Sequence, residues 1–289
     1  MDFALAHRYG SIIYRGSVSN AALLAAQSHF VNCGGFHDGL LLNIDDVTAN
    51  FVGRDGDTAV SDASALGLRL DVRQASGEMQ SLIDAQPKLT PNILGQNGTN
   101  FITDLGDNTY RFHGDGSSYT YIRFITGFTA GGRYYIKPEV IERIDGGIKA
   151  THNAVDSSLY SAFTATPEPL RAECETKIEF GRSGGGQPID ITVKFTVQEI
   201  PGNHMVAAAD DERGTYDITG EVAGNTLDGV NDAYTADCPD PAQGPYRILL
   251  GINTTDTIGT IFQTDAAGSY LGIMQNGNTG AINHTVHGT

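Results

Sequence analysis

Tryptophan is absent from this chain of 289 residues, cysteine occurs only three times, and basic residues are few. The 18 Lys and Arg residues are outnumbered by 34 Asp and Glu, which leaves a formal net charge of −16. A chain this acidic lacks the basic surface that neutralises nucleic-acid phosphates, so we expect no nucleic-acid partner. No apolar run approaches the ~18 residues of a spanning helix, so we expect no membrane span.

The cysteines and the N-terminus indicate where the protein is made. Cys33, Cys174 and Cys238 are far apart and form no Cys-x-x-Cys pair, which favours reduced thiols over a thiolate metal site. Residues 1–15 carry charged side chains but no apolar core of a secretory signal peptide, which predicts synthesis in a cytoplasm. We predict no cofactor, with a calcium ion on the acidic loops as the alternative.

Glycine is abundant, with 36 residues, and Gly-, Asn- and Asp-containing turns recur at short intervals. This spacing predicts an all-β protein, with a jelly-roll or β-sandwich domain rather than βαβ units. A short helix is expected over residues 20–30, where good helix formers follow a capping residue. Three regions are expected: an N-terminal docking region (1–85), the sandwich (86–202), and a small Gly-, Asn- and Thr-rich β region (203–289).

Several segments show the period-two alternation of half-buried strands. Residues 189–197 alternate without a break, and residues 177–180 are expected to form a hairpin with them through the glycines at 184–186. In residues 118–125 the pattern points Thr120, Ile122 and Phe124 inward. Residues 133–137 precede Pro138, which indicates a sheet edge or a bulge.

The outward side of residues 118–125 is the strongest candidate site. It carries Tyr119, Tyr121 and Arg123, with Tyr110 and His113 a little earlier in the chain. Aromatic rings and Arg on an exposed strand suit stacking on a sugar or a contact between subunits. Ordinary cross-strand packing of half-buried tyrosines is the alternative interpretation.

Evidence for catalysis in the sequence is weaker. Ser183 lies in a glycine-rich loop that we interpret as a turn. The carboxylates of Asp104 and Asp107 are the pair that could serve hydrolysis of a polysaccharide, a reaction that needs two carboxyl groups across one bond. Because their separation is invisible from sequence, a depolymerase stays open as an alternative.

Two stretches resemble known phage proteins. Residues 52–61, 65–71 and 86–89 resemble a segment common in tailed-phage structural proteins, although Lys88 departs from the usual pattern after the proline. Residues 110–136 resemble the carbohydrate-binding-module-like jelly rolls of phage tail and virion proteins, with Phe128 where the family has Leu and Tyr134 at its Tyr position.

The resemblance implies a non-enzymatic structural component of a bacteriophage or phage-like particle: a tail fibre, a tail-tip or collar protein, or a decoration protein. Its partners would be other copies of itself and other virion proteins, and its location the virion, after synthesis in the host cytoplasm. Host attachment through a surface glycan is a further role left open. The alternatives are a carbohydrate-binding adhesin that uses the Tyr and Arg face, and the depolymerase.

Overall fold

The computed structural model describes residues 5–6, 11–13, 49–70, 79–129, 131–153, 157–184, 186–202, 204–217, 224–226, 234–235, 249–250, 259–263, 270–276 and 281–287. Within these residues the secondary structure is almost all β-strand, with a single short helix, α2 (Met79–Asp84). This confirms the expected all-β sandwich class. The helix expected over residues 20–30 lies outside the described residues.

The chain divides into two compact units. Unit 1 comprises Met1–Val52, Val60–Arg73 and Gly202–Thr289, and unit 2 comprises Gly53–Ala59 and Gln74–Pro201. The expected N-terminal and C-terminal regions therefore both contribute residues to unit 1. Residues 86–201 of the expected sandwich region all belong to unit 2.

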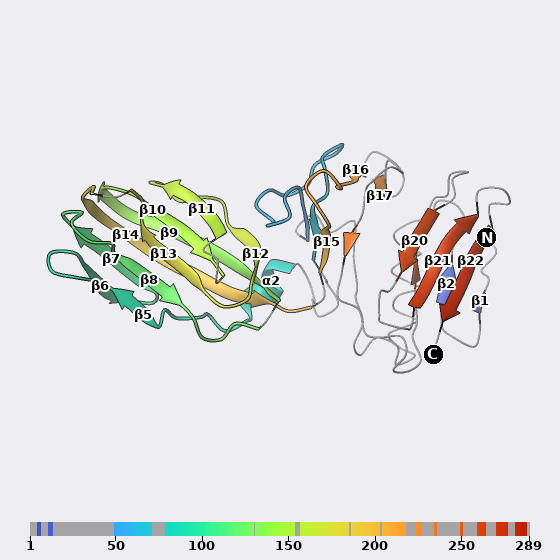
Figure 1. Cartoon of the computed structure of the whole chain (residues 1–289), viewed down its shortest axis with the longest axis horizontal. Coiled ribbons are helices and arrows are strands. Elements are labelled where there is room, and N and C mark those ends of the chain that lie inside the picture. The colour runs from blue at the N-terminus through green and yellow to red at the C-terminus, as the bar shows by residue number, and fades with distance from the viewer. Residues whose placement is uncertain are drawn as a thin grey trace. The chain divides into compact units, whose positions relative to one another are not determined.

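Unit 2 is built from two five-stranded sheets in which every neighbouring pair is antiparallel (Figure 1). The β8 sheet has the order β11-β10-β13-β8-β5, and the β14 sheet has the order β12-β9-β14-β7-β6. The strands are β5 (Ile93–Gly95), β6 (Phe101–Gly106), β7 (Thr109–Gly114), β8 (Tyr121–Phe124), β9 (Gly132–Asp145), β10 (Ile148–His152), β11 (Ser157–Phe163), β12 (Leu170–Cys174), β13 (Ile178–Arg182) and β14 (Ile189–Ile200).

The strand pairs of unit 2 are nested. β10 pairs with β11, β9 with β12, β8 with β13, and β7 with β14. The chain from β7 to β14 therefore follows one long hairpin whose tip lies between β10 and β11. Successive pairs along this hairpin alternate between the two sheets, so that both arms of the hairpin contribute to each sheet.

The expected hairpin between residues 177–180 and 189–197 is wrong. These segments form β13 and β14, which lie in different sheets. Each strand turns one face toward a shared core, and the rings of Phe180 and Phe195 meet there with their centroids 4.4 Å apart. The connecting loop uses Gly184 and Gly186 at φ values of 87° and 73°, a region that glycine adopts without steric cost.

The core lies between the two sheets and follows the predicted alternation. The apolar residues at 189, 191, 193, 195 and 197 of β14 are all buried, as expected. Phe195 is central, because its ring contacts those of Phe112, Phe124 and Phe180 from three other strands. The inward positions Thr120, Ile122 and Phe124 are also buried, as the sequence predicted.

Helix α2 packs at one end of β14. The buried amide of Gln198 donates hydrogen bonds to the carbonyls of Ile83 and Gln86, at 2.9 and 2.6 Å. These bonds tie carbonyl groups at the C-terminal end of the short helix to β14. Leu89 then donates its backbone N–H to Val197 and continues the chain along β14 toward β5.

The described residues of unit 1 form four small sheets. Their strands are β1 (Leu5–Ala6), β2 (Ser11–Ile13) and β19 (Leu249–Leu250); β3 (Asn50–Phe51), β4 (Leu68–Arg69), β15 (Met205–Ala207) and β18 (Tyr234–Thr235); β16 (Thr215–Asp217) and β17 (Gly224–Thr226); and β20 (Gly259–Gln263), β21 (Tyr270–Asn276) and β22 (Ala281–His287). Val60, Leu66 and Tyr216 form a small core. Tyr234 donates its hydroxyl proton to the Leu66 carbonyl, 2.8 Å away.

Candidate functional site

The strongest sequence candidates lie on the outer face of the β8 sheet. In β8, Ile122 and Phe124 are fully buried in the core, so the alternating Tyr121 and Arg123 point to the opposite, outer face. Tyr119 precedes β8 by two residues, and its side chain is 39% exposed. The predicted outward direction of these three side chains is therefore confirmed.

These side chains form a continuous stack with Lys149 of β10, which we call the Tyr–Arg row. The rings of Tyr119 and Tyr121 stack with their centroids 5.6 Å apart and their planes 29° apart. The Arg123 guanidinium carbon lies 4.3 Å from the Tyr121 ring centroid, and the Lys149 ammonium lies 5.7 Å from that of Tyr119. Both distances suit cation–π attraction, so a cation lies near each aromatic ring.

Two glycines on the neighbouring strands make room for the rings. Gly95 of β5 and Gly181 of β13 both lie directly opposite Tyr121. A Cβ added to Gly95 would lie 2.1 Å from Cε1 of Tyr121, and one added to Gly181 would lie 2.1 Å from the Tyr119 hydroxyl oxygen. The tyrosines therefore lie against bare backbone, which shields glycine positions that would otherwise weaken a strand.

An ion pair terminates the row. Arg123 donates from Nε to Glu179, which faces it directly on β13. The Glu179 side chain is almost completely buried, whereas about one third of the Arg123 side chain is exposed. A nearly buried carboxylate needs its charged partner. The ion pair therefore holds the partly exposed Arg123 side chain in place. The row thus offers an aromatic surface with Lys149 at one end and the Arg123–Glu179 ion pair at the other.

The other two predicted site residues do not join the row. Tyr110 of β7 is buried in the core with its ring 6.4 Å from that of Phe195, so its assignment to an exposed site is wrong. Burial, aided by the charge of Asp104, raises the pKa of Tyr110. His113 lies on the other sheet, where its Nδ1 is 3.4 Å from Asp190 and its ring is 5.0 Å from that of Phe101.

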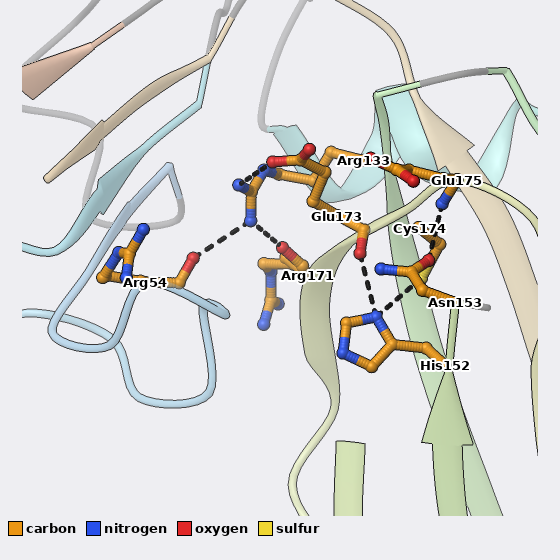
Figure 2. Close-up of polar contacts among 8 residues, drawn as sticks. All are labelled: Arg54, Arg133, His152, Asn153, Arg171, Glu173, Cys174 and Glu175. Atoms are coloured by element: carbon orange, nitrogen blue, oxygen red, sulfur yellow. Dashed lines mark hydrogen bonds and ion pairs between the residues drawn. The ribbon is translucent and has the colours of Figure 1, made fainter. Parts of the chain in front are cut away.

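A second polar cluster surrounds Arg133 at the start of β9 (Figure 2). The buried Arg133 donates to the carbonyls of Arg54 and Arg171, the first at 3.0 Å. Arg171 donates from Nη1 to the Gly56 carbonyl at 2.7 Å, and its guanidinium lies 5.2 Å from the ring of Tyr135. The two arginines bind backbone carbonyls of the 53–59 segment, so we interpret this cluster as a structural anchor for that segment.

Next to this anchor, Figure 2 shows a cysteine beside a histidine, an arrangement that resembles a nucleophile and its base. Cys174 Sγ lies 3.9 Å from Nδ1 of His152, which also lies 3.1 Å from the Glu173 carbonyl oxygen. Burial raises the pKa of Cys174 to about 12. The thiol is therefore protonated at neutral pH, whereas nucleophilic cysteines need a lowered pKa.

The serine candidate for catalysis lies in a loop between strands, and the two carboxylate candidates are held in structural contacts. Ser183 has the Gly-x-Ser-x-Gly spacing, with glycines at 181 and 185, but it lies between two strands rather than at a strand-to-helix turn. Asp104 accepts a hydrogen bond from the Gly106 N–H at 2.8 Å, and Asp107 pairs with Lys194. Both carboxylates thus belong to the β6–β7 turn and its surroundings.

The acidic loops offered as the calcium alternative include the one that carries Asp115. Asp115 accepts hydrogen bonds from the Thr99 hydroxyl, the Asn100 amide and the Ser117 N–H, and these bonds lower its pKa. In the part of the chain that the structure describes, no group of three His, Cys, Asp or Glu side chains could hold a metal ion.

Comparison of the chain with protein-family models, with curated proteins and with solved structures finds no match. Among the described residues, no helix is long and apolar enough to cross a membrane. The assignment of function therefore rests on the geometry of unit 2 and on the sequence patterns.

Proposed function

We propose that this chain is a non-enzymatic structural component of a bacteriophage or phage-like particle and that unit 2 is a jelly roll. The observation that carries the proposal is the nested pairing of β7 to β14, in which one long hairpin is folded into two facing sheets. The same nesting is expected of the double Greek key of a jelly roll, an architecture common in viral capsids and lectins, and it therefore supports the proposal. The resemblance of residues 52–89 and 110–136 to phage proteins points to the same class.

In this role the chain acts by contact rather than by chemistry. The Tyr–Arg row gives unit 2 a rigid aromatic face that needs little ordering when a partner binds. Tyr and Arg are among the residues enriched where protein surfaces meet. Other copies of the chain and other virion proteins are the proposed partners, in a particle assembled in the host cytoplasm.

The test is whether the protein is part of a particle. Particles are purified on a density gradient from cultures of the organism that carries the sequence. Peptide mass spectrometry and an antibody against the recombinant chain then locate the protein. Co-sedimentation with particles, in amounts comparable to their other structural proteins, supports the proposal. Recovery only in the soluble fraction, while the particles contain their other proteins, overturns it.

A specific observation favours glycan binding as a second candidate. Tyr119 and Tyr121 lie over two glycines on the open outer face of a sheet, and tyrosine rings there can stack against the apolar face of a sugar. The test is binding of the full chain to a glycan array. Tyr119→Ala should reduce any signal about tenfold, an ordinary loss for an aromatic contact.

Phe101→Ala is the matched control for this test, because Phe101 is similarly exposed (42%) but lies on β6 of the other sheet. It should leave glycan binding unchanged. An array on which the unmodified chain binds nothing contradicts the glycan role, as does a signal that Tyr119→Ala does not alter.

A further inference from the structure

Lys149 carries an exposed positive charge on the outer face of the β8 sheet. Its neighbours in β10, Ile148 and Ala150, are buried in the core, so the Lys149 side chain points outward. Within the described residues, no carboxylate forms an ion pair with its ammonium group. Arg123, at the other end of the Tyr–Arg row, differs because it is paired with Glu179. At Lys149 the row therefore ends in a positive charge that is available to a ligand.

Ser183 adds a hydroxyl group to the same face. It follows Gly181 by two residues, so both lie on the outer side of the sheet. The Ser183 N–H donates to the Gly147 carbonyl at 2.9 Å, and a Cβ added to Gly147 would lie 3.0 Å from the Ser183 hydroxyl oxygen. Among the residues that the structure describes, no group forms a hydrogen bond with this hydroxyl. It can therefore donate to a ligand or accept from one.

The strand register brings these groups to the ring of Tyr119. Gly181 lies opposite Lys149 on one side and opposite Tyr121 on the other, and the Tyr119 hydroxyl lies over it. The Lys149 ammonium is 5.7 Å from the Tyr119 ring centroid. Ser183 is two residues farther along the chain than Gly181, which is about 6.6 Å in an extended strand. One aromatic ring, one cation and one hydroxyl thus lie within the span of a single sugar residue.

This combination of groups suits a sugar that carries a negative charge. A tyrosine ring offers an apolar surface to the C–H face of a pyranose. A hydroxyl group can exchange hydrogen bonds with the sugar hydroxyls. An ammonium group forms a charge-assisted hydrogen bond with a carboxylate, which is roughly twice as strong as a bond between neutral groups. A neutral sugar forgoes this third contact, so charge complementarity favours an acidic one.

We propose that Tyr119, Lys149 and Ser183 form a subsite for one carboxylated sugar residue of an acidic polysaccharide. The inference rests on the glycan-binding candidate described above and names the class of its ligand. The sugar ring lies against Tyr119, its carboxylate pairs with Lys149, and one of its hydroxyls bonds with Ser183. Three contacts on an open face give weak binding to one sugar. Affinity rises where many copies of the chain meet the repeated carboxylates of one polymer.

The experiment measures binding of the full chain to polygalacturonate, to polysialic acid and to the methyl ester of each, by biolayer interferometry. Esterification removes the charge of the carboxylate and leaves the sugar ring unchanged. The chain should bind at least one of the acidic polymers, and should bind its methyl ester about tenfold more weakly, as expected for the loss of a hydrogen bond between charged groups. The two polymers distinguish a uronic acid from a sialic acid as the source of the carboxylate.

Variants of the chain test each contact. Lys149→Met keeps the length of the side chain without its charge and should reduce binding of the acidic polymer to the level of the methyl ester, whereas Lys149→Arg should retain most of the binding. Ser183→Ala should weaken binding about threefold, an ordinary effect for one neutral hydrogen bond. Circular dichroism checks that each variant keeps the fold.

Lys137→Met is the matched control, because Lys137 is also an exposed lysine but lies on β9 of the other sheet, with its ammonium 3.9 Å from Glu139. It should leave binding unchanged. Three results would overturn the acidic-sugar proposal: methyl esters that bind as well as the acids, equal losses in Lys149→Met and Lys137→Met, or no binding of either acidic polymer.

These results differ from a failure of the glycan candidate itself. If the array shows neutral glycans whose binding Tyr119→Ala reduces, and the acidic polymers bind no better than their esters, the glycan role is retained and the acidic subsite is lost. If the array shows no binding of any glycan, both are lost. The particle proposal is decided by the particle fraction alone.

Discussion

Tyr121 and Gly95 face each other across β8 and β5, and the tyrosine ring fills the space that a Gly95 side chain would need. This contact packs β5, an edge strand of the β8 sheet, against the Tyr–Arg row. The conformation of the row therefore depends on a residue that carries no side chain.

Gly95→Ala should destabilise unit 2 by about 1–3 kcal/mol, the usual cost of forcing an extra methyl group into an occupied site. The physical reason is the 2.1 Å distance between the added Cβ and Tyr121, which obliges the ring to leave its position. Urea unfolding followed by circular dichroism measures the change. In a Tyr121→Ala background the same substitution should cost clearly less, because the clash is gone. Equal costs in both backgrounds would show that the ring is not held over Gly95.

Breaking the Arg123–Glu179 pair should lower the free energy of unfolding by more than the partly exposed position of Arg123 suggests. Arg123→Met keeps an apolar stem beside Tyr121 but leaves the nearly buried Glu179 carboxylate without its cation. We expect a loss of about 1–3 kcal/mol, below the usual cost for a fully buried pair because Arg123 is partly solvated. Arg123→Met/Glu179→Leu should recover part of the loss, since both charges are then removed.

Lys149→Ala is the control for this pair, because the Lys149 side chain is exposed on the same row. It should change the free energy of unfolding by less than about 0.5 kcal/mol, as for most surface substitutions. If Arg123→Met changed the free energy of unfolding as little as Lys149→Ala, the carboxylate of Glu179 would have access to water or another partner.

The Asp190 carboxylate should contribute stability that depends on pH. Two hydrogen bonds from Arg111, both 2.8 Å long, hold the pKa of Asp190 below its usual range, and His113 adds to the effect. A group with a lowered folded-state pKa stabilises the fold above its unfolded pKa, near ~3.9, and loses this contribution as the pH falls through the folded value. Asp190→Asn should therefore be less stable than the unmodified chain at pH 7, and this difference should shrink below pH ~4.

Urea midpoints of both proteins between pH 7 and pH 2.5 measure this dependence. Thr192→Val is a suitable control, because Thr192 lies on the same face of β14 but carries no charge. The electrostatic role of Asp190 would be contradicted if the urea midpoints of Asp190→Asn and the unmodified chain differed by the same amount across the whole pH range.

Local pattern predicted the strands and the direction of their side chains. Residues 189–197 and 118–125 alternate because one face packs in the core, and this period is visible without a structure. The same rule could have corrected Tyr110. Tyr110 and His113 are three residues apart, and an odd spacing in a strand places two side chains on opposite faces.

Pairing between distant segments was beyond local pattern. A glycine-rich loop after β13 fits a hairpin as well as a crossing between sheets, and only the shared core around Phe180 and Phe195 decides between them. Lys149, Glu179 and the two glycines under the row come from other strands, so nothing near Tyr121 in the sequence indicates them.

The Cys174 thiol should be unreactive in the folded protein, although His152 lies beside it. Its burial raises its pKa to about 12, far above the ~8.5 of a free cysteine. A Cys33→Ser/Cys238→Ser variant leaves Cys174 as the single thiol, and its reaction with iodoacetamide at pH 8 can be followed by mass spectrometry. We expect native alkylation to be at least about 100-fold slower than alkylation of the same variant in urea, because so little thiolate is present. Fast native alkylation that titrates near neutral pH, lost in His152→Ala, would instead mark Cys174 and His152 as a reactive pair.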